Sequence, residues 1–256
     1  MFCLNIKLAT NKQLHRLKRQ VARHYRPLKE RRMKPREIFY KACNKIAIPF
    51  IEKGFKPMKN GQCLKKISKD KDLTFEVHFK SSTYNYSCST IIYPLISIYS
   101  KRLKKWMQEQ TGNINEAGLI YHNHIGYISP IKEYKQWELS GLSFDISVES
   151  IINLLEQYAI PIFDLFKDKT LAISFIEQYG CCFNKYTQNS LSALPYVLLH
   201  GDKEKAENYF NVYLQSCKCR KRFMTAFNQL DNKQNIELGL DNRFAIFAFI
   251  NGLKIK

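Results

Sequence analysis

The chain has 256 residues, of which 45% are hydrophobic and 25% are charged. This length and composition are typical of a folded globular protein, and they exclude a chain that is disordered or fibrous throughout. The 41 Lys and Arg residues exceed the 22 Asp and Glu residues and produce a formal net charge of +19, which favours a polyanionic partner without identifying one.

The positive charge is concentrated at the N-terminus. Residues 1–32 contain ten Lys and Arg residues and one acidic residue, and we expect them to form a basic N-terminal arm. Within this arm, an apolar stripe between Thr10 and Pro27 has helical spacing and predicts a helix. Met33 is a second candidate start of translation, and a chain beginning there would have a net charge of +10.

The apolar segments of the chain are too short for a secretory signal or a transmembrane helix. The sequence therefore predicts a cytoplasmic protein with no integral membrane association. Its eight cysteines are expected to be reduced thiols and not a disulfide framework.

Residues 33–147 have the pattern of a helix packed on an antiparallel sheet. Pro35 and Gly54 bound the predicted helix, and residues 73–80 alternate between apolar and polar as in a strand with one buried face. The apolar face of the helix consists of Phe39, Ala42, Cys43, Ile46, Ala47 and Phe50. Further strands are predicted at 62–67, 84–92, 95–100, 119–128 and 142–146, with a short basic helix at 101–110.

Residues 148–256 have the pattern of an α-helical portion packed on the sheet domain. Ser147 is a candidate N-cap for its first helix, which Pro161 should interrupt. Further helices are predicted at 169–179, 190–200, 203–216 and 241–251. The predicted fold class is therefore α+β, with an N-terminal helix packed on an antiparallel β-sheet, followed by an α-helical C-terminal portion.

Three stretches of the chain carry a family resemblance. They are the helix end at 46–55, the extended run at 73–81, and residues 124–130 followed by Trp137. Together they resemble a bacterial family of domains of unknown function, number 4304, over about residues 33–180. The resemblance implies an α+β fold and brings no catalytic residue. Some similar proteins look like immunity or defence components, which makes such a role an analogy.

His122 and His124 lie two positions apart in a predicted strand, so both side chains should project from one face and are candidate metal ligands. No carboxylate stands at a diagnostic spacing from them, and we expect neither a metal nor another cofactor. Glu76 and His78 could meet these histidines across the sheet, which leaves an enzyme as the least favoured alternative. Hydrolase, phosphate-loop and dinucleotide motifs are missing, so we expect no catalytic residues.

Basic clusters are the strongest remaining signal, and they predict contacts with backbone phosphates. The candidate phosphate-binding residues are Arg16, Lys18, Arg19, Arg23, Arg26, Arg31, Arg32, Lys101, Arg102, Lys104 and Lys105. Tyr84, Tyr86 and Trp106 are candidates for stacking on exposed bases, although aromatic residues at alternating strand positions more often belong to a core.

Two functions therefore stay open. The favoured hypothesis is a non-catalytic intracellular bacterial binding protein with an immunity or defence role through a protein partner. The alternative is a nucleic-acid-binding protein that uses the basic arm and the lysine clusters, and it predicts strongly salt-dependent binding. An immunity protein against a nuclease would more naturally be acidic, so the positive charge favours an acidic partner or another class of toxin.

Overall fold

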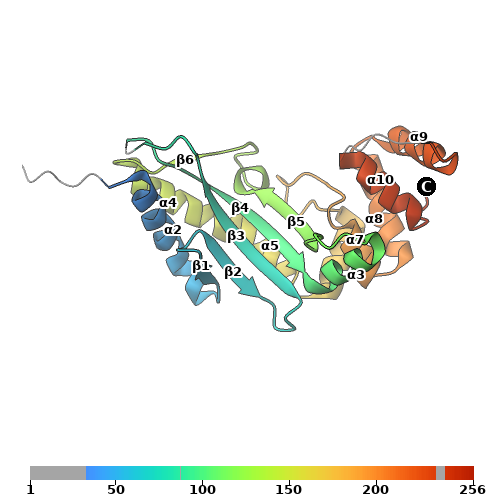
Figure 1. Ribbon diagram of the computed structural model, residues 1–256, viewed down its shortest axis with the longest axis horizontal. Helices are drawn as coiled ribbons and strands as arrows, with labels where there is room; N and C mark the ends of the chain where they lie inside the picture. The colour runs from blue at the N-terminus through green and yellow to red at the C-terminus, as the bar shows by residue number, and fades with distance from the viewer. Residues whose placement is uncertain (1–32, 87, 235–239) are drawn as a thin grey trace, which may run out of the picture. The chain divides into compact units, whose positions relative to one another are not determined.

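The computed structural model describes residues 33–86, 88–234 and 240–256, and Pro35–Lys256 form one compact unit. The predicted basic arm, with its helix and its seven candidate phosphate-binding residues, lies outside the described residues. The fold is α+β, as the sequence predicts: an antiparallel sheet with a helical C-terminal portion (Figure 1).

The strands are antiparallel in the order β1-β2-β3-β4-β5, and β6 pairs with β4. Their bounds are β1 Lys56–Met58, β2 Cys63–Ile67, β3 Leu73–Ser81, β4 Ile91–Ser100, β5 Leu119–His124 and β6 Trp137–Glu138. The helices up to the end of the sheet domain are α2 Pro35–Glu52, α3 Lys101–Thr111, the 3-10 turn η1 Ile125–Ile128, α4 Ser143–Leu154, the π-helical turn η2 Leu155–Ala159 and α5 Ile160–Leu165. The remaining helices are α6 Lys169–Tyr179, α7 Leu194–His200, α8 Lys203–Ser216, α9 Arg220–Asp231 and α10 Leu240–Ile250.

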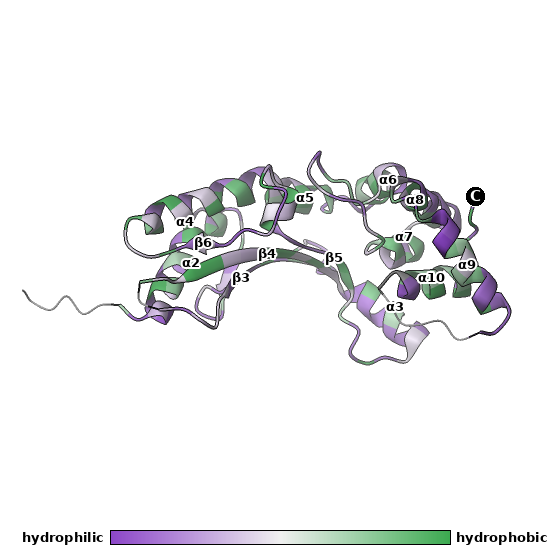
Figure 2. Cartoon of the chain, turned by 90° about the horizontal axis from the view of Figure 1, so that it is seen from above, coloured by the Kyte–Doolittle hydropathy of each residue, from purple (hydrophilic) through white to green (hydrophobic). Residues whose placement is uncertain are grey.

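Helices cover one face of the sheet. Figure 2 shows α2, α4 and α5 on one side of β3 and β4, with no described helix below the opposite side of these strands. The six apolar residues predicted for α2 are the ones that it buries. Gly54, two residues after the last residue of α2, has a positive φ of 85° and terminates the helix, and the Phe55 N–H donates to the Phe50 carbonyl.

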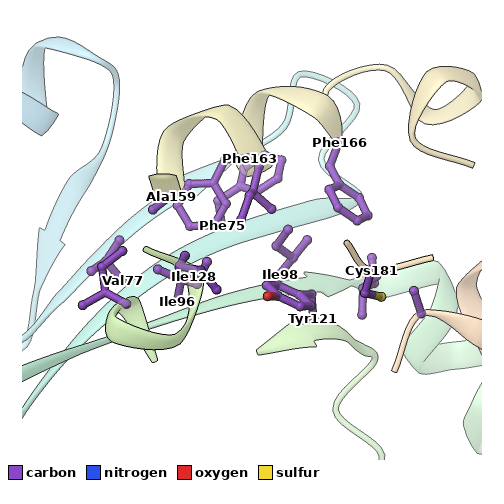
Figure 3. Packing of buried hydrophobic residues seen from close by; sticks show 14 of the residues in the cluster. Phe75, Val77, Ile96, Ile98, Tyr121, Ile128, Ala159, Phe163, Phe166 and Cys181 are labelled. Carbon is purple, nitrogen blue, oxygen red and sulfur yellow. The ribbon is translucent and has the colours of Figure 1, made fainter. Parts of the chain in front are cut away.

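The core lies between this helical layer and the sheet (Figure 3). Phe75 and Val77 of β3 and Ile96 of β4 point from the sheet toward η2 and α5. The Phe163 ring of α5 lies 5.3 Å from the Phe75 ring, centroid to centroid. Burying a side chain of this size stabilises the fold by roughly 1.5–3 kcal/mol, so the helical layer is held to the sheet mainly by apolar contacts.

The predicted strand boundary at Pro94 is wrong. The structure has one long strand, β4, where two were expected, and most of the predicted strand 84–92 belongs to the β3–β4 connection. Phe79 donates its N–H to the carbonyl of Gln62, the residue before β2, so the backbone polar groups of its partner Pro94 point away from β3. On the side of β4 away from β3, β5 pairs with residues 95–99 and β6 pairs with residues 91–92. Pro94 therefore lies in the gap between these two strands, where no N–H donor is needed.

Three expectations around α4 are also wrong. Residues 142–146, predicted as a strand, contain the first turn of α4. Ser147 is therefore inside the helix, where its hydroxyl donates to the Glu138 carbonyl at 2.6 Å and does not form an N-cap. Pro161 does not end the helical run, because the π-helical turn η2 leads directly into α5 and places this proline in the first turn.

Later helices agree better with the sequence. The predicted segments 169–179 and 203–216 match α6 and α8, and 241–251 matches α10 within one residue at each end. The predicted helix at 190–200 begins later, at Leu194, and α9 was not predicted as a helix. The boundary expected between residues 147 and 148 falls inside α4.

Two further findings concern membranes and thiols. No helix among the described residues combines the length and the apolar character that crossing a bilayer requires. Each cysteine in the described part of the chain is a free thiol, and Cys43 and Cys181 are buried while Cys88 and Cys217 are exposed.

Candidate functional site

The candidate site is the sheet face opposite α2, α4 and α5, which we call the open face. Side chains alternate along a strand, so the open face receives Glu76 and His78 from β3 and Ser97 from β4. Strand register then forms a polar row across four strands, in which Lys65 pairs with Glu76, Glu76 with Ser97, and Ser97 with His122. This row places groups from distant parts of the sequence side by side.

Glu76 of the polar row interacts with two basic side chains, Lys65 and His78. Lys65 Nζ lies 3.2 Å from Glu76 Oε1, and Glu76 Oε2 lies 2.8 Å from His78 Nε2. The hydrogen bond with His78 lowers the pKa of Glu76, and the Lys65 ammonium lowers it further. Hydrogen bonds with Cys63 and with Glu76 raise the pKa of His78 to about 9. His78 is therefore protonated at neutral pH and forms an ion pair with Glu76.

Cys63 joins this group from β2. The Phe79–Gln62 hydrogen bond makes those two residues a hydrogen-bonded pair, so the next pair, Cys63 and His78, is of the closer, non-hydrogen-bonded kind. Donor atoms of Cys63, Glu76 and His78 all lie within 4.8 Å of one another. A thiol, an imidazole and a carboxylate are the groups of a nucleophilic site, but Cys63 is only 5% exposed, which disfavours attack on an external substrate.

A second feature of the open face is a basic hollow beside the polar row, with a volume of about 320 Å³. Lys65, Lys101 and Lys104 line this hollow together with Glu76 and Tyr99. The lysines come from β2 and from the first turn of α3, so the hollow depends on how α3 is attached to the sheet. Three ammonium groups against one carboxylate make it suited to an anion.

Asp72 and Ser100 hold the first turn of α3 in place. The Ser100 hydroxyl accepts the N–H of Leu103 at 3.0 Å and donates to the Asp72 carboxylate. Asp72 Oδ1 also accepts the N–H of Arg102 at 2.8 Å, so the residue before β3 and the last residue of β4 satisfy two free N–H groups at the helix start. This cap fixes the direction in which Lys101 and Lys104 leave the sheet.

The structure divides the predicted phosphate-binding residues. Of the four on α3, Lys101 and Lys104 line the basic hollow, whereas Arg102 and Lys105 do not. Lys105 instead lies 3.9 Å from Glu109, one helical turn further along. The seven candidates of the arm lie outside the described residues.

The three aromatic stacking candidates do not meet at the hollow. Tyr84 and Tyr86 are 80% and 64% exposed and lie in the β3–β4 connection, at the end of these strands away from α3. Trp106 is partly buried and packs edge to face on Phe247 of α10, with ring centroids 6.2 Å apart. Tyr99 lines the hollow in their place.

The two candidate metal-binding histidines are in different environments. His122 Nδ1 lies 2.8 Å from the Ser97 hydroxyl, and burial together with the positive charges of His78 and Lys80 lowers its pKa. His124 is buried, its Nδ1 accepts the N–H of Gly126, and burial lowers its pKa as well. Among the described residues, the group of three that could hold a metal contains neither of them.

The sequence pattern linked Glu76 to His78 but did not connect Cys63, Lys65 or Ser97 with them. A signal existed for the first two, because Cys63 and Lys65 alternate on one side of a predicted strand. Nothing local marked Ser97, and the pairing of all three with β3 or β5 follows from register across the sheet.

Comparisons with known proteins bear on this part of the chain. No curated protein and no solved structure matches it. One family model does match, and the matched segment runs from the middle of α2 to the end of α5, so it contains the whole sheet with the polar row and the basic hollow. Residues 46–165 match the family described as Domain of unknown function (DUF4304), which confirms the predicted family resemblance over this segment.

Proposed function

We propose that the protein binds the phosphate backbone of a single-stranded nucleic acid on its open face, without catalysing a reaction. The observation that carries this proposal is the convergence of lysines from β2 and α3 on one hollow, at the sheet face that α2, α4 and α5 leave uncovered. Among the described residues, neither Lys101 nor Lys104 has an acidic side chain within ion-pair distance. Both ammonium groups are therefore available to a phosphate.

The hollow also has an aromatic side chain on its wall. Tyr99 is half-buried on its wall, where a base could stack on the exposed part of the ring. Lys65 is held by Glu76, so it contributes less than the two lysines of α3. A sheet face that is left uncovered by helices and has cationic groups at one end resembles the sheet surfaces on which other proteins bind extended single strands.

The test is fluorescence anisotropy of a labelled single-stranded oligonucleotide with the full chain, at a series of salt concentrations. We expect the slope of log affinity against log salt to fall by about 0.7 for each phosphate contact removed, so Lys101→Ala and Lys104→Ala should each reduce it. Lys105→Ala is the matched control, because this lysine is on the same helix but outside the hollow.

Two results would refute the proposal. One is the absence of binding at low salt. The other is binding that disappears on deletion of residues 1–32 but is unchanged in Lys101→Ala and Lys104→Ala, which would assign it to the basic arm.

A protein partner is the second candidate function, with the immunity or defence role as its predicted purpose. Exposed apolar residues favour it: Ile48 and Ile51 on α2, and Leu142 and Ile146 at the start of α4. Co-expression with each product of a neighbouring gene and co-elution on size exclusion would test it. We expect a complex to be lost in Ile146→Lys and retained in Ile250→Lys. Ile250 is the matched control, because its side chain on α10 is as exposed as that of Ile146. The absence of any stable complex would count against this candidate.

A cytoplasmic location belongs to the same proposal. The exposed free thiols Cys88 and Cys217 fit a reducing compartment, in which they stay unpaired.

A further inference from the structure

The Cys63, Glu76 and His78 side chains form a compact set of potential metal ligands on the open face. Cys63 and His78 are cross-strand partners, and Glu76 is two positions before His78 on the same face of β3. Their donor atoms lie within 4.8 Å of one another, and the Glu76 and His78 donors are 2.8 Å apart. Ligands around a tetrahedral zinc ion are separated by about 3.5 Å, given Zn–S and Zn–N lengths of about 2.3 and 2.1 Å. Small side-chain rotations would therefore suffice.

The chemistry of these donors selects the ion. Thiolate and imidazole ligands favour zinc over magnesium or calcium, which prefer oxygen. A thiolate, a carboxylate and a neutral imidazole together carry a charge of −2, which a divalent cation neutralises. Binding forms three metal–ligand bonds and releases to water the thiol proton of Cys63 and the imidazolium proton of His78.

We propose that Cys63, Glu76 and His78 bind one zinc ion on the open face. The His78 and Glu76 side chains are 25% and 14% exposed, so water can reach the site and occupy a fourth position. Zinc would draw Glu76 away from Lys65, which lies 3.2 Å from the same carboxylate in the metal-free arrangement. This inference concerns a different ligand from the proposed nucleic acid and does not depend on it.

The experiment uses the full chain after dialysis against a chelator and removal of the chelator. Zinc is titrated in competition with a chromophoric chelator, and cobalt is added to a second sample to detect a thiolate-to-cobalt charge-transfer band. We expect one zinc ion per chain and a cobalt band. Both Cys63→Ser and His78→Gln should weaken zinc binding by more than about tenfold, a loss at least as large as that seen on removing outer-shell groups.

Matched controls are available within the same chain. Cys88→Ser removes an exposed cysteine, and His122→Gln removes the neighbouring histidine of the polar row, so both should retain zinc and the cobalt band. Circular dichroism of each metal-free variant shows whether it is folded. If Cys63→Ser does not fold, two other measurements test the site. Glu76→Gln should weaken zinc binding, and the cobalt band should persist in Cys88→Ser, which excludes Cys88 as the thiolate.

The proposal is overturned by any of three results. These are no stoichiometric zinc binding by the wild-type chain, zinc binding that persists unchanged in the folded ligand variants, and loss of zinc in His122→Gln. The assay contains no nucleic acid, so its outcome is separate from that of the anisotropy experiment.

Discussion

Replacing Asp72 by alanine removes the buried carboxylate that anchors α3 to the sheet. Asp72 is 6% exposed, and it accepts hydrogen bonds from the Ser100 hydroxyl and from the Arg102 N–H. A hydrogen bond to a charged group contributes about 1.5–3 kcal/mol, and loss of a helix N-cap costs typically about 1 kcal/mol. These contributions overlap, so we expect Asp72→Ala to lower the free energy of unfolding by about 2–4 kcal/mol.

Urea unfolding followed by circular dichroism measures this change as a lower midpoint with an unchanged m value. Asp72→Asn retains an acceptor oxygen without the charge and should lose less than the alanine variant. Ser100→Ala removes the direct partner, so the double variant should show a coupling energy of about 0.5–3 kcal/mol.

If Asp72→Ala changes the unfolding free energy by less than about 0.5 kcal/mol, the range of an ordinary surface substitution, Asp72 does not anchor α3. Additive effects of Asp72→Ala and Ser100→Ala would also contradict this anchoring, because they would show that the two side chains do not act as one cap. In either case α3 would be held to the sheet by its apolar contacts, such as buried Leu103, and not by these hydrogen bonds.

Two further predictions concern titratable groups. Burial raises the pKa of the Cys43 thiol, so at pH 8 a thiol-alkylating reagent should modify exposed Cys88 and leave Cys43 intact in the native chain. Mass spectrometry measures both modifications. Comparable alkylation rates for the two cysteines would contradict the packing of α2. In the metal-free chain, NMR titration should show a His78 pKa near 9, and Glu76→Gln should bring it toward 6.5. Because folding raises the pKa of His78, the ion pair should stabilise the fold fully below about pH 6.5 and lose its effect as pH rises through 9. The difference in melting temperature between wild type and Glu76→Gln should therefore shrink over that interval. A constant difference would contradict the ion pair.

Local sequence patterns were sufficient to predict those elements whose periodicity and end signals agree. The apolar face of α2 has helical spacing between Pro35 and Gly54, and all six of its predicted core residues are buried. Residues 73–80 alternate with a period of two, and β3 follows that alternation. In both elements the periodicity and the end signals favour the same conformation, so tertiary contacts had nothing to override.

Where local signals disagreed with the tertiary environment, the environment decided. Pro94 suggested a break, but β4 continues through it because the gap between β5 and β6 needs no donor there. Residues 142–146 have a composition that suits a strand, yet they begin a helix that packs beside α2, with the Lys45 ammonium 2.6 Å from Asp145. Apolar residues suit either conformation, and only the surface against which they pack selects one.

Residue type and spacing along the chain are enough to predict the α+β class, the main helices and the chemical groups available to a site. The meeting of Cys63 with His78, and the arrangement of Lys65, Lys101 and Lys104 around one hollow, follow from tertiary contacts. Strand register and the cap at α3 bring these residues together, and both arise from contacts between segments that are distant in sequence. A shift of one residue in register would turn the polar row into the core, so the burial of Phe75 and Val77 holds the candidate site on the open face.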